Sequence, residues 1–131
     1  LDCIQYKPSL GHITTFGGNP VICAAANAGL VKYKSLENSL EVEEKGLLVQ
    51  NLLSKHPKVT AFRRSGLMIG INLETADQVS SLILKCREKG LLLFWFLSVP
   101  NGFRISPPLV ISKTEIRRGC SVIIETLNEL V

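Results

Sequence analysis

The 131-residue sequence has few aromatic residues and lacks long apolar runs. Aromatic side chains make up only 6% of the chain, so there is no array on which nucleic-acid bases could stack. The net charge of +4 is spread over scattered basic residues, which indicates a solvated surface rather than a nucleic-acid patch. No apolar stretch approaches the length that crosses a bilayer, and no charged-then-apolar leader is present. We therefore expect neither nucleic acid nor membrane among the partners.

The sequence also lacks the residue spacings of metal and redox sites. Its cysteines, Cys3, Cys23, Cys86 and Cys120, are too far apart for a CxxC pair. Neither histidine lies at metal-ligand spacing from the other or from a cysteine. The last three cysteines fall at apolar positions of expected helices, where a free thiol packs as a small hydrophobe. We expect no metal site and a reducing, cytoplasmic location.

Composition predicts a single globular domain. Hydrophobic residues make up 46% of the chain and charged residues 20%, which is ordinary for a folded domain and argues against disorder. A chain of this length buries about two-thirds of its unfolded surface. Because the first residue is Leu1 rather than methionine, we expect the sequence to be a fragment of a longer protein.

Two long helices are expected near the start of the chain. Residues 20–31 are apolar or small on every face, which predicts a helix that is buried on most sides. Ser35 is a candidate N-cap for a second helix that runs to about Lys55, with Gly46 as a weak point inside it. The expected apolar stripe of this second helix consists of Leu36, Leu40, Leu47, Leu48 and Leu52.

The middle of the chain has the pattern of β-strands. Residues 59–63 and 67–73 predict two strands joined by a turn at 64–66. The second of these is nearly all apolar, which favours a central position in a sheet. Gly70 within it indicates close approach by a neighbouring element. Two further strands are expected at 91–96 and 103–106.

Two later helices begin with capping boxes, in which the side chains of the first and fourth residues satisfy free amides. These boxes are Thr75 with Gln78 and Ser112 with Glu115, and Gly90 is expected to end the first helix. The order of elements predicts an α+β fold: a mostly antiparallel four-stranded sheet with helices packed on one face, preceded by one or two long helices. The expected apolar stripes are Val79, Leu82, Ile83 and Cys86, then Ile116, Cys120, Ile123, Leu127 and Leu130.

The stretch from Gly11 to Pro20 has the strongest chemical pattern. Asn19 is a good N-cap, and Pro20 suits the first position of a helix. Two glycines precede them, and Thr14 and Thr15 place hydroxyls beside these glycines. Such a loop can bind phosphate, but it also fits an ordinary tight turn with a cap. It has neither the Gly-Lys-Ser/Thr ending of the Walker loop nor the third glycine of the dinucleotide fingerprint.

The run His-Ile-Thr-Thr-Phe-Gly-Gly-Asn-Pro at 12–20, followed by Cys-Ala-Ala-Ala at 23–26, closely resembles the class III pyridoxal-phosphate-dependent aminotransferases. The resemblance implies that Thr15 hydrogen-bonds the cofactor phosphate of the neighbouring subunit and that Thr14 lies in the same loop. It also implies the domain organisation. Residues 1–20 would be a linker from the large domain that carries the phosphate motif, and residues 21–131 the C-terminal small domain of a fold-type I aminotransferase.

Arg104 lies in a second landmark of this family, Arg-x-x-Pro-Pro-Leu, which ends at Leu109. The planar guanidinium of arginine holds a carboxylate through two parallel hydrogen bonds, although a surface arginine that pairs with any nearby acid is the common alternative. The resemblance implies that Arg104 binds the α-carboxylate of glutamate or 2-oxoglutarate. A third landmark, Arg-Gly-x-Gly-Leu-Met-x-Gly, matches residues 63–70, except that Arg64 replaces the first glycine.

The resemblance further implies a homodimeric enzyme that uses pyridoxal phosphate to move an amino group from an acetylornithine, ornithine or other ω-amino donor to 2-oxoglutarate. The catalytic Schiff-base lysine is expected in a large domain outside this sequence. The fragment alone should therefore be inactive and should not hold the cofactor. Two other hypotheses remain: a stand-alone α+β anion-binding or regulatory module, and a purely structural dimerisation domain.

Overall fold

The computed structural model describes residues 14–130, and the chain divides into two compact units, Leu1–Ser39 and Leu40–Val131. The first unit contains helix α2 (Pro20–Leu36) and a 3-10 turn (Glu37–Ser39). Predictions that fall on Cys3 or on Gly11 to Ile13 lie outside the described residues. The predicted domain boundary after residue 20 stays a prediction.

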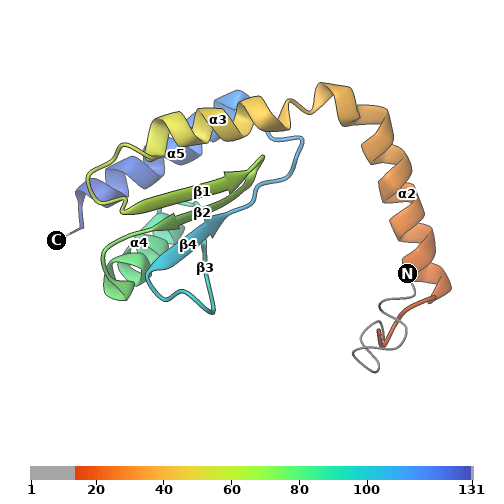
Figure 1. The fold of residues 1–131 in the computed structure, drawn as a ribbon, viewed down its shortest axis with the longest axis horizontal. Coiled ribbons are helices and arrows are strands. Elements are labelled where there is room, and N and C mark those ends of the chain that lie inside the picture. Colours follow the sequence, from red (N-terminus) through yellow and green to blue (C-terminus); the bar gives the residue numbers. More distant parts are fainter. Residues whose placement is uncertain (1–13, 131) are drawn as a thin grey trace. The chain divides into compact units, whose positions relative to one another are not determined.

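The second unit is built on a four-stranded antiparallel sheet, as predicted (Figure 1). Its strands lie in the order β1-β2-β4-β3, so β2 and β4 are the central pair. The expectation that the apolar strand is central is confirmed for β2. The third strand is shorter than predicted, because only two of its residues pair with β4. The bounds are β1 Ala61–Ser65, β2 Met68–Asn72, β3 Phe94–Trp95 and β4 Gly102–Ile105.

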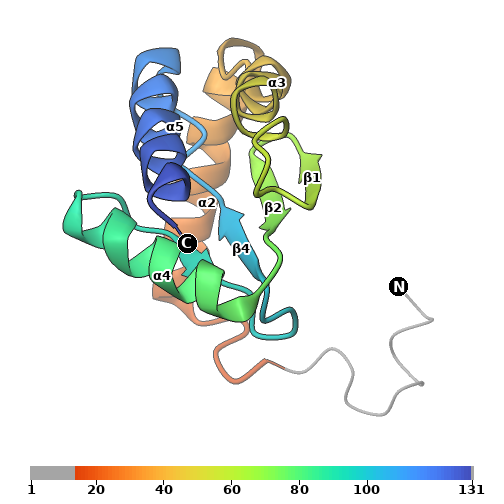
Figure 2. The same cartoon turned by 90° about the vertical axis from the view of Figure 1, so that its left-hand side faces the viewer.

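Three helices cover one face of this sheet: α3 (Val42–Leu53), α4 (Ala76–Glu88) and α5 (Lys113–Asn128). Helix α3 contacts α5 and β1, whereas α4 contacts α5, β3 and β4 (Figure 2). The core between helices and sheet is apolar, and its fully buried side chains include Leu53, Ile71, Leu82, Phe103 and Leu127. None of the helices among residues 14–130 is both long and apolar enough to span a bilayer.

Both predicted capping boxes are present. Thr75 Oγ1 accepts from the Gln78 amide at 3.2 Å, and Ser112 Oγ accepts from the Glu115 amide at 3.2 Å. The hydrogen bonds from Ser112 to the Glu115 side chain hold the pKa of that carboxyl below its usual value. The predicted apolar stripes of α4 and α5 are buried throughout. Because Cys120 lies in the α5 stripe, burial raises the pKa of its thiol to about 11.

The hairpin between β1 and β2 turns at Gly66-Leu67, not at 64–66 as predicted. Ser65 still pairs with Met68, so the loop has two residues, and Gly66 supplies the positive φ of 54° at its first position. Arg64 therefore lies in a strand, where a side chain causes no strain. Its Nε donates to Gln50 Oε1 at 2.7 Å, and its Nη1 pairs with Glu43 at 2.7 Å.

Helix α2 corrects three predictions. It continues to Leu36, and Ser35 is not a cap, because its hydroxyl donates to the carbonyl of Lys32 inside the helix. None of its residues is buried, and Cys23 is exposed, so the predicted burial is wrong for the described chain. A pattern that is apolar on every side indicates that a helix is buried against other elements, but it does not indicate to which chain those elements belong.

Helix α3 begins at Val42, later than predicted, so Leu36 and Leu40 of the predicted stripe lie outside it. Leu40 is nevertheless buried, and Leu48 and Leu52 pack against the core as predicted. Leu47 is exposed, while Val49 and Leu53 are buried. Gly46 is buried in the middle of this face, and a Cβ placed there would clash with the carbonyl oxygen of Gly66. The glycine that weakens the helix pattern is thus what allows α3 to lie against the β1–β2 turn.

We predict that Gly46→Ala destabilises the second unit by about 1–3 kcal/mol, because the methyl group must displace backbone atoms. Helix propensity alone predicts the opposite sign, a gain of up to ~1 kcal/mol. Gly119→Ala in α5 is the matched control, since its Cβ would meet only Leu91 at an ordinary 3.7 Å. Urea unfolding of each variant measures the difference. A Gly46→Ala protein as stable as Gly119→Ala would contradict this packing.

Candidate functional site

Thr14 and Thr15 lie on an exposed turn immediately before α2. The Gly17 amide donates to the Thr14 carbonyl at 3.5 Å, and the Asn19 amide donates to the Phe16 carbonyl at 3.1 Å. A Cβ on Gly17 would clash with Thr14 Oγ1, so the glycine provides the space that this hydroxyl occupies. Gly18 adopts a positive φ of 76°. The turn therefore presents hydroxyl donors on a backbone in which Gly18 has a conformation that favours glycine and Gly17 leaves room for the Thr14 hydroxyl.

The first turn of α2 is already capped by Asn19, as predicted. Its Oδ1 accepts from the amides of Val21 at 3.0 Å and Ile22 at 3.3 Å. Its carbonyl accepts from the Cys23 amide at 2.9 Å. Because Pro20 has no amide hydrogen, the amides of this turn are all satisfied. An anion at this loop would thus be held by the threonine hydroxyls and the preceding turn, not by the helix end.

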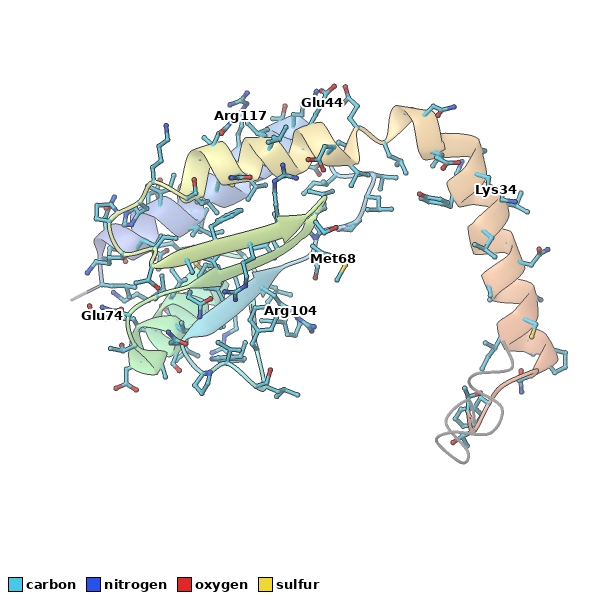
Figure 3. All side chains as sticks on the ribbon, viewed as in Figure 1. Lys34, Glu44, Met68, Glu74, Arg104 and Arg117 are labelled. Atoms are coloured by element: carbon cyan, nitrogen blue, oxygen red, sulfur yellow. The ribbon has the colours of Figure 1, made fainter. Side chains whose placement is uncertain are left out.

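Arg104 lies in the centre of the sheet, on the face opposite the helices. Its neighbour Phe103 is fully buried in the core, and successive side chains of a strand point to opposite faces. Figure 3 shows Arg104 directed away from α3 and α5, whereas Arg117 lies on the far side of this unit. The Arg104 guanidinium carbon is 5.3 Å from the centroid of the Phe94 ring, a cation–π contact across the β4–β3 pair.

The open face of the sheet carries a groove of about 380 Å³ beside Arg104. Gly70 forms part of its floor, and the Phe96 ring lies 3.2 Å from where a Gly70 Cβ would be. The predicted close approach at Gly70 is therefore confirmed. Arginine supplies the charged side chains of the lining, and neither a carboxylate nor a lysine is among them. The lining consists of Arg63, Arg64, Ser65, Met68, Ile69, Gly70, Phe96, Arg104, Ile105 and Ser106.

A second hollow, of about 320 Å³, lies on the other side of the segment that contains Arg104. Most of its lining is apolar and comes from the ends of β3 and β4 and from α5, including Leu91, Ile105 and Ile116. Among residues 14–130, no group of three or more His, Cys, Asp or Glu side chains is arranged to hold a metal ion. The arginine-lined groove is thus the better candidate for binding a small polar ligand.

The sequence analysis placed Arg63 in a family landmark without giving it a role in a site, and it gave no such role to the aromatic residues Phe94 and Phe96 either. Arg63 pairs with Gly70, and Gly70 pairs with Arg104, so the register places both arginines in one row across the sheet. That row is visible only once the order of the strands is known. The predicted residues Thr14 and Thr15 belong to the first unit, and Arg104 belongs to the second.

Comparison with protein families identifies the chain. Residues 2–127 match the model of the family described as aminotransferase class-III. The chain belongs to this family. Class III aminotransferases depend in general on pyridoxal phosphate, and the match covers nearly the whole sequence.

The chain is similar to curated acetylornithine aminotransferases from several organisms. It is 37% identical to that of Haemophilus ducreyi over 119 residues, which is 91% of this chain and 29% of the relative. It is also 37% identical to that of Caldanaerobacter subterraneus over 135 residues, which is 98% of this chain and 33% of the relative. The chain therefore spans about a third of the length of the relatives it matches.

Solved structures share the fold. The acetylornithine aminotransferase of Elizabethkingia anophelis matches with a TM-score of 0.74 and 32% identity, covering 91% of this chain and 32% of that one. The ornithine aminotransferase of Toxoplasma gondii matches with a TM-score of 0.72 and 28% identity, covering 92% of this chain and 29% of that one. That protein was crystallised with pyridoxal phosphate at partial occupancy in its active site.

Proposed function

We propose that this chain is the C-terminal part of a class III aminotransferase that transfers an amino group from acetylornithine, ornithine or another ω-amino donor to 2-oxoglutarate. The observation that carries the proposal is Arg104, which projects from a central strand into a groove without carboxylates. Similarity to acetylornithine and ornithine aminotransferases supports the choice of donor and acceptor.

Arg104 binds the α-carboxylate of the acceptor in this proposal. Its guanidinium offers two parallel donors that match a carboxylate. Contact with the Phe94 ring leaves the edge of the guanidinium free to donate while restricting the motion of its plane. Pairing with Gly70 on one side and Phe94 on the other fixes the backbone from which the side chain extends.

The residues of the turn before α2 fit the phosphate of pyridoxal phosphate. Thr14 and Thr15 are exposed hydroxyl donors, and the helix amides behind them are already satisfied. The two hydroxyls would hold the phosphate of the cofactor in the partner subunit of a homodimer. When bound, the cofactor acts as the electron sink of the reaction.

The Schiff-base lysine belongs, in this proposal, to the large domain of the same enzyme. The arginine-lined groove contains no lysine. Lys45 is buried and donates to the Leu109 carbonyl at 3.0 Å, and Lys89 and Lys113 form ion pairs with glutamates. These observations support a binding role for this chain and the inactivity of the isolated fragment.

We predict that Arg104→Ala in the full-length enzyme raises the KM for 2-oxoglutarate about 10- to 100-fold, since a hydrogen-bonded charge contributes about 1.5–3 kcal/mol. The KM of the amino donor should change much less. Steady-state kinetics with each substrate varied separately measures both values. Arg117→Ala, which removes an exposed arginine from α5, is the control. An unchanged acceptor KM would remove Arg104 from the site.

Thr15→Ala in the full-length enzyme should weaken pyridoxal phosphate binding about tenfold or more, because it removes a hydroxyl donor to a charged phosphate. Thr14→Ala tests the neighbouring hydroxyl in the same way. Cofactor titration of the apoenzyme, followed by absorbance, gives the dissociation constants. Ser81→Ala, at an exposed position of α4, controls for loss of a hydroxyl. If the threonine variants keep the original cofactor affinity, the loop has a structural role only.

A further inference from the structure

We propose that Lys45 is a positioning residue for Arg104. Its buried ammonium group holds the connection between β4 and α5 (residues 106–112), which follows Arg104 directly in the chain. This inference rests on the proposed function of the groove. It assigns a role to a residue of α3 that does not line the groove and that lies outside the family landmarks.

The β4–α5 connection has few backbone hydrogen bonds of its own. Its two adjacent prolines have no amide hydrogen to donate. The Ile111 amide donates to the Pro108 carbonyl at 3.0 Å within the connection. Among residues 14–130, the one hydrogen bond that ties the backbone of 107–111 to another element comes from Lys45, whose Nζ donates to the Leu109 carbonyl at 3.0 Å (Figure 1). Lys45 thus fixes where this connection lies.

A lysine is a costly choice for this position. Lys45 is only 6% exposed, and it is the one buried charged side chain in the part of the chain that the structure describes. No carboxylate of that part pairs with it, whereas the exposed Lys113 pairs with Glu41 and Glu44. Burial of an unpaired ammonium group is unfavourable, and an apolar side chain of similar length would fill the same space without that cost. Core stability alone therefore does not explain the lysine.

The connection that Lys45 holds is also part of the groove. Ser106 lines the groove beside Arg104 and lies three residues before Leu109. The prolines between Ser106 and Leu109 have a fixed φ, which makes this short stretch stiff. A displacement at the Leu109 carbonyl is therefore transmitted to Ser106 and to the end of β4.

Helix α3 supports the neighbouring wall of the groove as well. Gly46, the next residue after Lys45, lies against the Gly66 carbonyl in the β1–β2 turn. Ser65 and Met68 flank this turn, and both line the groove. Since β2 and β4 are antiparallel and pair up to their ends at this turn, the turn and the β4–α5 connection lie at the same end of the sheet. Two adjacent residues of α3 thus hold both segments at that end.

Lys45 acts through the backbone and does not contact the ligand. A carboxylate engages both parallel donors of a guanidinium only within a narrow range of geometries. When the Leu109 carbonyl is released, the end of β4 shifts and the Arg104 donors lose their fixed direction. Ligand binding is weakened although every group that contacts the ligand is still present.

The test compares Lys45→Met and Lys45→Arg in the full-length enzyme. Methionine keeps an unbranched apolar chain but cannot donate to the Leu109 carbonyl, whereas arginine keeps a donor and the charge. We expect Lys45→Met to raise the KM for 2-oxoglutarate and the dissociation constant of glutarate, measured by calorimetry, about 3- to 10-fold. The KM of the amino donor should change less than about twofold. Lys45→Arg should recover most of the affinity. Lys55→Met makes the same change at an exposed position just after α3 and is the control.

Stability and hydrogen exchange distinguish a positioning role from a purely structural one. Since Lys45→Met removes a buried charge and water can reach the exposed Leu109, we expect its melting temperature to be unchanged or higher. The amides of residues 109–111 should exchange hydrogen faster than in the unmodified enzyme, because the connection has lost its tie to α3.

The inference is overturned if Lys45→Met leaves glutarate binding unchanged, or if it lowers the melting temperature and weakens both substrates equally. Arg104→Ala keeps this result separate from the proposed function. If Arg104→Ala loses acceptor affinity and Lys45→Met does not, only the role of Lys45 fails. If neither variant loses acceptor affinity, the proposed function of the groove fails as well.

Discussion

The antiparallel register between β2 and β4 is the constraint on which the candidate site depends. Pairing of Ile71 with Phe103 sends both side chains into the core, where each is fully buried. The same pairing places Gly70 opposite Arg104 on the other face. A slip of one residue would bury the charge of Arg104 and expose Phe103, because side chains alternate along a strand. Burial of the core thus fixes the direction of the Arg104 side chain.

The elements that were predicted correctly have local sequence patterns, whose residues lie close together along the chain. The capping boxes at Thr75 and Ser112 and the buried stripe of α5 need no knowledge of the rest of the fold. The same holds for β2, whose apolar run indicated a central strand before its partners were known. Arg104 was named as a candidate through a short motif; the structure places it beside a groove, and its binding role stays a prediction.

Features that depend on contacts between distant residues could not be predicted in this way. Gly46 was a weak point in a helix pattern, but its contact with Gly66 explains why a glycine lies there. Ser35 failed for a local reason: serine is common at helix starts, but α2 continues past it and its hydroxyl donates to the Lys32 carbonyl. Arg63 begins one of the family landmarks, but only the strand order puts it in a row with Arg104.

We propose that this chain supplies binding residues to an aminotransferase, and that the bond-making lysine belongs to the large domain. The most direct measurement is a crystal structure of the full-length protein with pyridoxal phosphate and glutarate bound. We expect one glutarate carboxylate within hydrogen-bond distance of the Arg104 guanidinium, and the cofactor phosphate beside Thr15 of the neighbouring subunit. Glutarate held by other residues, with Arg104 directed into solvent, would contradict it.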